Sequence, residues 1–370
     1  MAEPRDIFIV CNAVDELGGL QQWAHDVSGL FTDRGHRVTL IGVEPADVHR
    51  DYGDDARFKK LTLHDHHLPR KGWFRTRRRA SQQAEGARRL SALFREARPG
   101  AVVIAAQVWA GEWVAAADTT GMVTIGMSHE SFEASKNSSR YNRARIYYEG
   151  LDIHLALTET DADSWARAGM TNVGAMPNPL MTVPETLPTL EEKTVVTLRR
   201  ISHDKGIDML VEAWAQVGPL YPDWRLKIFG SGPDEEAFRA LARELGLDDT
   251  QIFQGQTDDK DAALSAASIY ALPSREEGFP IALMEAMAYG LPTVAFDCAP
   301  GVTELIEDDV SGGLVVTPGN VPGMAAALER LIKDHDLRVR LGEAGQRSVQ
   351  RYSPDHIIDR WEALFALLER

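Results

Sequence analysis

Short runs of β-forming residues alternate with amphipathic stretches along the whole chain, and this alternation limits the fold more than any other feature. It is typical of parallel sheets built from β-α-β units. The runs form two series, one in each half of the chain, so we expect two sheets. The strands expected in the first series are Ile7–Val10, Val38–Val43, Ala101–Ala106, Val123–Met127 and Ile153–Leu157, and those in the second are Thr194–Leu198, Arg225–Phe229, Ser268–Leu272, Thr293–Phe296 and Leu314–Val316.

The segment between the two series indicates a domain boundary. Residues 181–192 contain Pro184 and Pro188 and show no apolar periodicity, which is typical of a linker. A chain of 370 residues also exceeds what one hydrophobic core usually fills. We therefore expect an α/β protein with two Rossmann-like domains, residues 1–180 and 193–350. Residues 351–370 carry an apolar stripe that includes Trp361 and predict a final helix.

Composition excludes several classes of protein. Hydrophobic residues make up 44% and charged residues 26%, as in globular enzymes, and the net charge of -15 disfavours a nucleic-acid-binding protein. The two cysteines, Cys11 and Cys298, are far apart and suggest neither a disulfide framework nor a zinc site. The first apolar run is too short for a secretory signal, and no run reaches the roughly 18 apolar residues of a membrane-spanning helix. A cytoplasmic location is expected.

Two glutamates bracket a segment that follows one of the expected strands. Glu277 lies in the loop after Ser268–Leu272, and Glu285 lies about two turns along an expected helix from Pro280 to Tyr289. Open α/β sheets bind ligands at the carboxyl ends of their strands. A carboxylate accepts hydrogen bonds from vicinal hydroxyl groups, which suits one glutamate to a sugar ring and the other to a ribose. Two surface glutamates on a polar loop and helix are the alternative.

Two cations follow the first strand of the second series. Arg200 and Lys205 precede the helix that starts near Ile207, so their loop opens at the same end of the sheet. Such cations can hold a diphosphate and neutralise the charge that develops when it leaves. The helix start at Gly278 and Pro280 also favours an anion. A solvated charged loop is the alternative for Arg200 and Lys205.

The first domain offers weaker candidates. Gly18 and Gly19 follow the first strand, where a residue without a side chain lets the backbone approach a phosphate or sugar, although a plain tight turn fits equally well. His129 follows Val123–Met127 and can contact a sugar or the reacting centre, and a hydrogen-bonded structural histidine is its alternative. Asp161 and Asp163 suggest a metal-binding pair, but they open a helix after Thr158 and are better interpreted as capping residues.

Taken together and in order, these segments resemble the family-4 retaining glycosyltransferases with the GT-B fold, in which two Rossmann-like domains face each other across a cleft. The likeness extends over nearly the whole chain. The segments that carry it are Gly18 to Leu20, Gly35 to Val38, His129, Met176 to Pro179, Arg200 to Gly206, Phe229 to Pro233, Pro273 to Pro280, Glu285 to Pro292, and Gly301 to Ile306.

The resemblance implies an enzyme that transfers a hexosyl-type sugar from a nucleotide-sugar donor with retention and without a metal or cofactor, most often from a uridine diphosphate donor. It implies that Glu285 binds the ribose, that Arg200 and Lys205 bind the diphosphate, and that Glu277 binds the sugar hydroxyls. Catalytic roles are expected for Glu277, Arg200, Lys205 and His129, with Gly18 and Gly19 on the donor from the first domain. The backbone implied to grip sugar and phosphate is that of Gly278, Phe279, Pro280 and Ile281.

This chain departs from the family at one position in the phosphate loop. Arg199 stands where the family usually has glycine, directly before the arginine that matches the family pattern. A bulkier residue there is expected either to alter the loop or to add a third cation. The final helix is implied to return to the first domain.

The acceptor is a glycan, a cell-envelope polymer or a lipid-linked molecule by the same resemblance. Arg70–Arg79 is densely cationic and contains aromatic residues, which predicts contact with an anionic membrane surface at its inner face or with an anionic acceptor. A solvated loop is the alternative. The nearby His64, His66 and His67 suggest a metal-binding tract, but an exposed loop is favoured because no partner cysteine or helical spacing accompanies them. Two other functions stay open: a sugar-nucleotide epimerase, and a protein that binds nucleotide-sugars without turnover.

Overall fold

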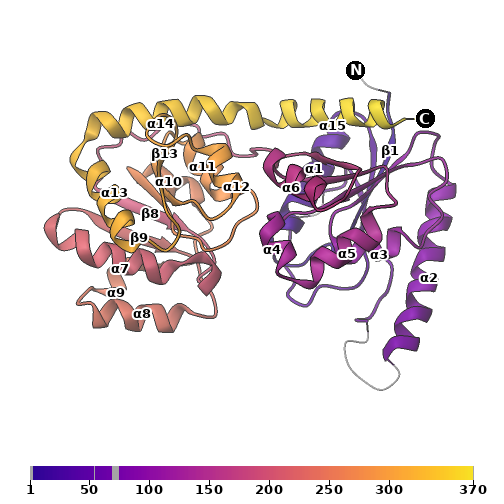
Figure 1. Cartoon of the computed structure of the whole chain (residues 1–370), viewed down its shortest axis with the longest axis horizontal. Helices are drawn as coiled ribbons and strands as arrows, with labels where there is room; N and C mark the ends of the chain where they lie inside the picture. Colours follow the sequence, from indigo (N-terminus) through magenta and orange to yellow (C-terminus); the bar gives the residue numbers. More distant parts are fainter. Residues whose placement is uncertain (1–2, 54, 69–74, 370) are drawn as a thin grey trace. The chain divides into compact units, whose positions relative to one another are not determined.

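The chain folds into two compact units. The computed structural model describes residues 3–53, 55–68 and 75–369, except for the side chains of residues 75–78. Unit 1 comprises Met1–Pro179 and Pro354–Arg370, and unit 2 comprises Leu180–Ser353 (Figure 1). Residues 181–192 have no regular secondary structure and are counted with unit 2. The last helix, α15, belongs to unit 1.

Unit 1 is built on a parallel sheet. Within its described residues the sheet has seven strands in the order β3-β2-β1-β4-β5-β6-β7. All six residues of β1 are buried, as expected for a central strand covered on both faces. The strands are β1 (Asp6–Cys11), β2 (Arg37–Gly42), β3 (Lys59–Thr62), β4 (Val102–Ala105), β5 (Val123–Met127), β6 (Ile153–Ala156) and β7 (Val173–Ala175). The helices are α1 (Gly19–Asp33), α2 (Arg75–Arg95), α3 (Val108–Val114), α4 (Phe132–Lys136), α5 (Ser139–Tyr148), α6 (Glu159–Arg167) and α15 (Pro354–Leu368).

Unit 2 repeats this plan with a sheet of six parallel strands, in the order β10-β9-β8-β11-β12-β13. The strands are β8 (Thr194–Leu198), β9 (Arg225–Phe229), β10 (Phe253–Gly255), β11 (Ile269–Leu272), β12 (Thr293–Phe296) and β13 (Gly313–Val316). The helical segments are η1 (His203–Lys205), α7 (Ile207–Val217), η2 (Gly218–Leu220), α8 (Glu235–Glu244), α9 (Asp249–Ile252), α10 (Lys260–Ser265), α11 (Ile281–Ala288), α12 (Pro300–Leu305), α13 (Val321–Lys333), α14 (His335–Val349) and η3 (Gln350–Tyr352).

The strand order identifies both units as Rossmann-like. In each sheet the first strand in sequence lies between the second and the fourth, so that the chain reverses its direction of progress there. This order, 3-2-1-4-5-6, is that of dinucleotide-binding folds, which place ligands outside the carboxyl ends of the strands at the point of reversal. The expected fold class, α/β with two Rossmann-like domains, is therefore confirmed. The points of reversal lie between β1 and β4 in unit 1, and between β8 and β11 in unit 2.

Three strands were not predicted from the sequence, and all three lie at sheet edges. They are β3 and β7 in unit 1 and β10 in unit 2. Edge strands need not be apolar on both faces, and β3 begins with Lys59 and Lys60 in place of an apolar run. The ten predicted strands are all present within one residue at each end; nine are interior strands, mostly rich in apolar residues although β9 also carries Arg225 and Lys227, and the other is the apolar edge strand β13.

The final helix packs on the first helix of unit 1. Trp361 of α15 is fully buried, and its ring centroid lies 5.9 Å from that of Phe31 on α1 and 5.7 Å from that of Phe365. Arg34, near the end of α1, pairs with Asp359 of α15 at 2.9 Å. Apolar packing and an ion pair thus hold α15 on unit 1.

Removal of the Trp361 side chain is expected to destabilise unit 1. Trp361→Ala should lower the free energy of unfolding by roughly 3–5 kcal/mol, because a large fully buried side chain is lost. Leu367→Ala on the same helix is the control, since Leu367 is 80% exposed. Urea unfolding followed by circular dichroism measures both variants. Equal effects of the two substitutions would contradict the packing of α15 described here.

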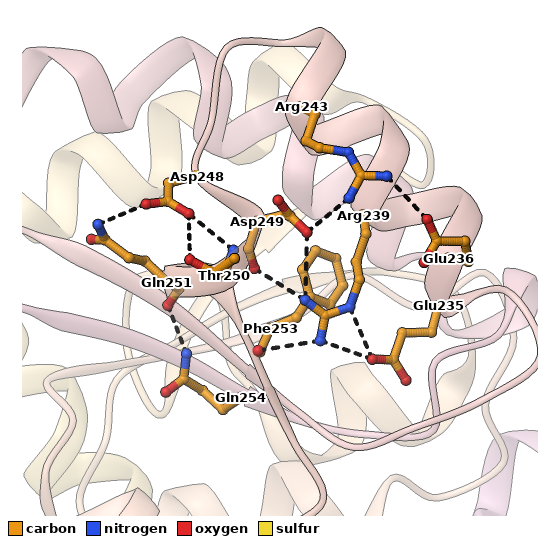
Figure 2. Close-up of polar contacts among 10 residues, drawn as sticks. All are labelled: Glu235, Glu236, Arg239, Arg243, Asp248, Asp249, Thr250, Gln251, Phe253 and Gln254. Atoms are coloured by element: carbon orange, nitrogen blue, oxygen red, sulfur yellow. Dashed lines mark hydrogen bonds and ion pairs between the residues drawn. The ribbon is translucent and has the colours of Figure 1, made fainter.

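A network of charged residues fixes α8 and α9 beside the edge strand β10 (Figure 2). Arg239 donates to Glu235 Oε1 at 3.0 Å, and its guanidinium lies 4.8 Å from the ring centroid of Phe253. Arg243 donates to Glu236 Oε1 and Asp249 Oδ2, both at 3.0 Å. Since both arginines already have acidic partners, this network serves the fold and is no candidate ligand site.

The predicted contact with a membrane falls largely outside the described residues. Of Arg70–Arg79, only the side chain of Arg79 is described, and it donates to Glu112 Oε2 at 2.9 Å. Among the described residues, no helix combines the length and the apolar character needed to cross a membrane.

Candidate active site

The candidate site of unit 2 lies where the strand order of its sheet reverses, between β8 and β11. β8 and β11 are neighbours, with Val195 opposite Ile269 and Val196 opposite Tyr270. The loop after β8 carries Arg199, Arg200 and Lys205, and the loop after β11 carries Ser274 and Glu277. The fold therefore brings residues separated by about 70 positions together at the carboxyl ends of these two strands.

Glycines of the β9–α8 loop let this loop pack against the backbone after β8. A Cβ at Gly230, whose φ is +134°, would lie 1.8 Å from the carbonyl oxygen of Arg199. The backbone N–H of Arg199 donates to Phe229 O at 2.9 Å, and that of Ile201 donates to Ser231 O at 2.9 Å. The main chain around Arg199 and Arg200 is thus held on one side by β9 and its loop.

The glycine directly after Lys205 fixes the position of its backbone. Gly206 has φ +65° and ends η1, and a Cβ on it would lie 1.9 Å from Pro273 O in the β11 loop. Arg275 joins the loop after β11 to the start of α7, because its guanidinium forms two 2.7 Å hydrogen bonds with the Asp208 carboxylate. This close approach brings the Lys205 side chain to Glu277.

Glu277 is the centre of the site. Its side chain is 10% exposed, and Oε1 accepts hydrogen bonds from Lys205 Nζ at 3.1 Å, from Ser274 Oγ at 2.7 Å and from Arg199 Nη2. Burial alone would raise the pKa of Glu277, but the charges of Arg199 and Lys205 outweigh it and hold the pKa below its ordinary value of 4.5. No hydrogen bond to Oε2 is found within the described residues, so this oxygen can accept from a ligand.

Arg199 is the residue for which the sequence left two outcomes open, an altered loop or a third cation. Its side chain is 5% exposed and is directed to Glu277, so the arginine that replaces the expected glycine adds a third cation to the site. Arg200, the predicted ligand, is exposed, and within the described chain its side chain forms no hydrogen bond or ion pair. The structure therefore brings Lys205 and Glu277 together and leaves Arg200 at the surface of the same loop.

Glu285 lies on α11, which begins directly after the Glu277 loop. The prediction of about two turns along this helix was wrong: Glu285 is the fifth residue of α11, which begins at Ile281, and at 3.6 residues per turn this is just over one turn from its start. Its Oε1 accepts from Thr182 Oγ1 at 3.1 Å and lies 3.5 Å from Lys260 Nζ. Its side chain is 16% exposed, so it is reachable by a ligand.

Residues 278–281 form the start of α11, where backbone N–H groups are left without helical partners. Pro280 is the N-cap, and Phe279 is 4% exposed, with its ring centroid 5.2 Å from that of Tyr352. A Cβ at Gly301 would lie 2.2 Å from Gly278 O, so α12 approaches this backbone closely. The segment is fixed by packing, as a preorganised anion site requires.

Three predicted residues lie in unit 1. Gly18 is the N-cap of α1, and Gly19 is exposed at the start of this helix, where a Cβ would meet no described atom within 4 Å. His129 follows β5, and its ring centroid lies 4.6 Å from that of Trp23. The Nε2 of His129 is buried, without a hydrogen-bond partner in the described part of the chain. The alternative of a hydrogen-bonded structural histidine therefore has no support at this nitrogen.

The ring of His129 is expected to stay neutral between about pH 5.5 and pH 8. Burial lowers the pKa of His129 to about 4 from its ordinary 6.5. Because the unfolded chain binds this proton more readily, the stability that the neutral ring contributes is present above pH 6.5 and is lost as the pH falls toward 4. NMR of the histidine ring, assigned with His129→Asn, should show no titration in the neutral range. A resonance of His129 that moves between pH 6 and 7 would contradict it.

Asp161 has the capping role suggested by the sequence. Thr158 is the N-cap of α6 and accepts the Asp161 N–H, and the Asp161 carboxylate accepts from Phe132 N at 2.8 Å and from Thr158 Oγ1 at 2.8 Å. Its oxygens are occupied by these bonds within unit 1.

Comparison with known proteins finds its family match in the second unit. Residues 183–348 match the family described as glycosyl transferases group 1. An uncharacterized glycosyltransferase of Haemophilus influenzae is 35% identical over 215 residues, which are 58% of this chain and 61% of that protein. The lipopolysaccharide 1,6-galactosyltransferase of Escherichia coli is 28% identical over 199 residues, 50% of this chain and 54% of that protein. The matches thus span little more than half the length of these relatives.

Solved structures share the fold of the chain. The structure of Anabaena HepE in complex with UDP and glucose has a TM-score of 0.76 and 18% sequence identity, and the match covers 98% of this chain and 99% of that one. The likeness shows the fold, which is that of the GT-B proteins, as the resemblance in the sequence implied.

Proposed function

From the premise that residues 183–348 form a domain of the glycosyl transferases group 1 family, we propose that the chain transfers a hexosyl-type sugar from a nucleotide-sugar to an acceptor hydroxyl. The observation that carries this proposal is the carboxylate of Glu277, whose Oε1 binds three donors while Oε2 has no partner among the described residues. An oriented, ionised carboxylate in contact with Lys205, with Arg200 exposed on the same loop as Lys205, suits a sugar joined to a diphosphate.

The donor is proposed to lie along the reversal point of unit 2. Glu277 Oε2 accepts from hydroxyls of the transferred sugar, Arg200 and Lys205 bind the diphosphate, and Glu285 accepts from the ribose. The N–H groups at the start of α11 add a partial positive charge near the phosphates. Uridine diphosphate is the favoured carrier, and the Anabaena structure that shares this fold holds UDP and glucose.

The proposed reaction retains the anomeric configuration. The bond between the anomeric carbon and the diphosphate oxygen breaks, and its electron pair leaves with the diphosphate. The acceptor oxygen bonds to the same carbon from the same face and gives its proton to the departing phosphate. Arg200 and Lys205 stabilise the charge that builds on the diphosphate, which is the role that a metal ion fills in other transferases. We propose that no metal is needed.

The acceptor is proposed to be a glycan, a cell-envelope polymer or a lipid-linked molecule, in line with the lipopolysaccharide-modifying relative of Escherichia coli. Arg70–Arg79 would bring the chain to an anionic surface at the cytoplasmic face of the membrane. Sedimentation with vesicles of phosphatidylglycerol, compared with phosphatidylcholine alone, tests this part. Binding to both kinds of vesicle alike, or to neither, would contradict it.

The function is tested first by donor binding. Thermal unfolding is measured with UDP-glucose, UDP-galactose, UDP-N-acetylglucosamine and GDP-mannose, and one of them should stabilise the chain by about 2.7 kcal/mol at a concentration 100 times its dissociation constant. Incubation of that donor with acceptor extracts, with and without EDTA, should release nucleoside diphosphate equally. NMR of the product gives the anomeric configuration.

Two other functions predict different products. A sugar-nucleotide epimerase would convert the donor alone into a second sugar, and a binding protein would be stabilised without releasing nucleoside diphosphate. Either result would replace the proposed transfer.

A further inference from the structure

Two cations compete for one oxygen of Glu277, and they differ in exposure. Arg199 and Lys205 both reach Oε1, but the Arg199 side chain is 5% exposed whereas that of Lys205 is 24% exposed. Lys205 also lies 3.5 Å from Asp204 Oδ2, at the rim of the site. Lys205 can therefore turn to a bound anion, while Arg199 is confined beneath the carboxylate.

Arg199 is poorly satisfied as a structural residue. Its Nε and Nη1 are buried and have no hydrogen-bond partner in the described part of the chain, and the same holds for Tyr270 Oη and Thr197 Oγ1. Buried polar groups without partners destabilise a fold. The Nη2 of Arg199 donates to Glu277, its one acidic hydrogen-bond partner among the described residues, and the Tyr270 side chain interacts with the same guanidinium. The value of an arginine at this position thus lies in what it does to Glu277.

We propose that Arg199 is a positioning residue, which holds the Glu277 carboxylate with Oε2 open to the donor sugar and thereby frees Lys205 to bind the donor diphosphate. The inference rests on the proposed function and assigns to one residue a task that the sequence did not reveal. Arg199 does not touch the donor itself. Ser274 assists from below, because its hydroxyl donates to the same Oε1 at 2.7 Å.

The surroundings of Glu277 explain why a second cation is needed. The ionisable groups that face it are Arg199 after β8, Lys205 of η1 and Cys298 after β12, and Tyr270 of β11 lies behind Arg199. Burial raises the pKa of the Cys298 thiol to about 12, so it is neutral and leaves the two cations as the counter-charges. When Lys205 turns to the diphosphate, Arg199 remains as the positive charge that keeps the largely buried carboxylate ionised.

The experiment compares Arg199→Gln, which removes the charge, with Arg199→Lys, which keeps it. Arg338→Gln is the matched control, because Arg338 is another buried arginine of unit 2, 6% exposed, and it donates to the carbonyl oxygens of Leu190, Leu331 and Ile332. Dissociation constants for UDP and UDP-glucose are measured by calorimetry, or for GDP and GDP-mannose if that pair binds the parent chain. The carboxyl resonance of Glu277, assigned with Glu277→Gln, is titrated by NMR.

In Arg199→Gln, the nucleoside diphosphate should bind more weakly than to the parent chain, because Lys205 is then the remaining cation on Glu277, and the nucleotide-sugar should lose still more affinity because the carboxylate is also no longer positioned. The ratio of the two dissociation constants should shift about tenfold against the nucleotide-sugar, which corresponds to 1.4 kcal/mol. The pKa of Glu277 should rise. As the pH is lowered from neutral, binding of the nucleotide-sugar should therefore weaken at a higher pH than in the parent chain. Arg199→Lys should restore most of this ratio of dissociation constants. Arg338→Gln should lower thermal stability and leave the ratio unchanged.

An unchanged ratio and an unchanged titration of Glu277 in Arg199→Gln would overturn the inference and leave the proposed function standing. So would an equal loss of binding for both ligands, because that would make Arg199 a diphosphate ligand or a structural residue. If the parent chain binds no nucleotide-sugar of the panel, the proposed function and the inference fail together.

Discussion

Glu277→Gln is expected to lower turnover by about 10³-fold, since the oriented charge of this carboxylate is lost where the reacting sugar is proposed to bind. Glutamine has nearly the same size, so packing around Ser274 and Phe279 should be preserved. The amide bears no charge and leaves the buried Arg199 without a counter-ion, while Lys205 keeps Asp204 at 3.5 Å. Release of nucleoside diphosphate at saturating donor measures the effect.

Glu276→Gln is the matched control for this prediction. Glu276 precedes Glu277 and is exposed, so its replacement should leave turnover within a factor of about two. Thermal unfolding of both variants separates a loss of activity from a loss of structure. A Glu277→Gln variant that folds and turns over as fast as the parent chain would refute the role of this carboxylate.

The pH dependence of turnover follows from the same group. The pKa of Glu277 lies below its ordinary value of 4.5, so the ionised form and the stability that it contributes are present above pH 4.5 and are lost only as the pH falls further. His129 is neutral in this range. Neither group should therefore produce an inflection in turnover between about pH 5.5 and pH 8.

Lys205→Ala is expected to reduce turnover by about 10²- to 10³-fold, because one of the two cations proposed to stabilise the leaving diphosphate is removed. The affinity for free nucleoside diphosphate should also fall, since Lys205 is proposed to bind it in the ground state. Glu277 keeps Arg199 as its counter-ion, so the fold should be preserved.

Lys193→Ala serves as the control for Lys205→Ala. Lys193 directly precedes β8 in the same unit. Its side chain is exposed and pairs with Asp223. Its removal should change neither turnover nor nucleotide affinity. Equal effects of the two substitutions would mean that the total charge of unit 2 matters and that the position of Lys205 does not.

The sequence allowed the two sheets and the loops of the site to be predicted because most interior strands are rich in apolar and β-branched residues. Three of the four edge strands were missed because an edge strand needs no second apolar face, and β3, for example, begins with two lysines. Gly35 and Gly246 lie just past the apolar stripes of α1 and α8, and both have positive φ, as a glycine that ends a helix is expected to have. Such local rules operate within a few residues and are visible without a fold.

The pairing of Arg199 with Glu277 could not be predicted in this way. In a half-buried strand, alternation of apolar and polar residues tells which side chains face inward, but β8 is buried on both faces from Thr194 to Thr197. The sequence therefore does not tell which of two adjacent arginines enters the site. The close approach of the β11 loop at Gly206 and of the β9 loop at Gly230 decides it, and both depend on tertiary contacts.

The most direct test of the central claim is a crystal structure of the chain with the nucleotide-sugar that stabilises it most. The account predicts one donor at the reversal point between β8 and β11, with its diphosphate on Arg200 and Lys205, its sugar on Glu277 and its ribose on Glu285. A donor bound elsewhere in unit 2, with these four side chains out of reach, would contradict it.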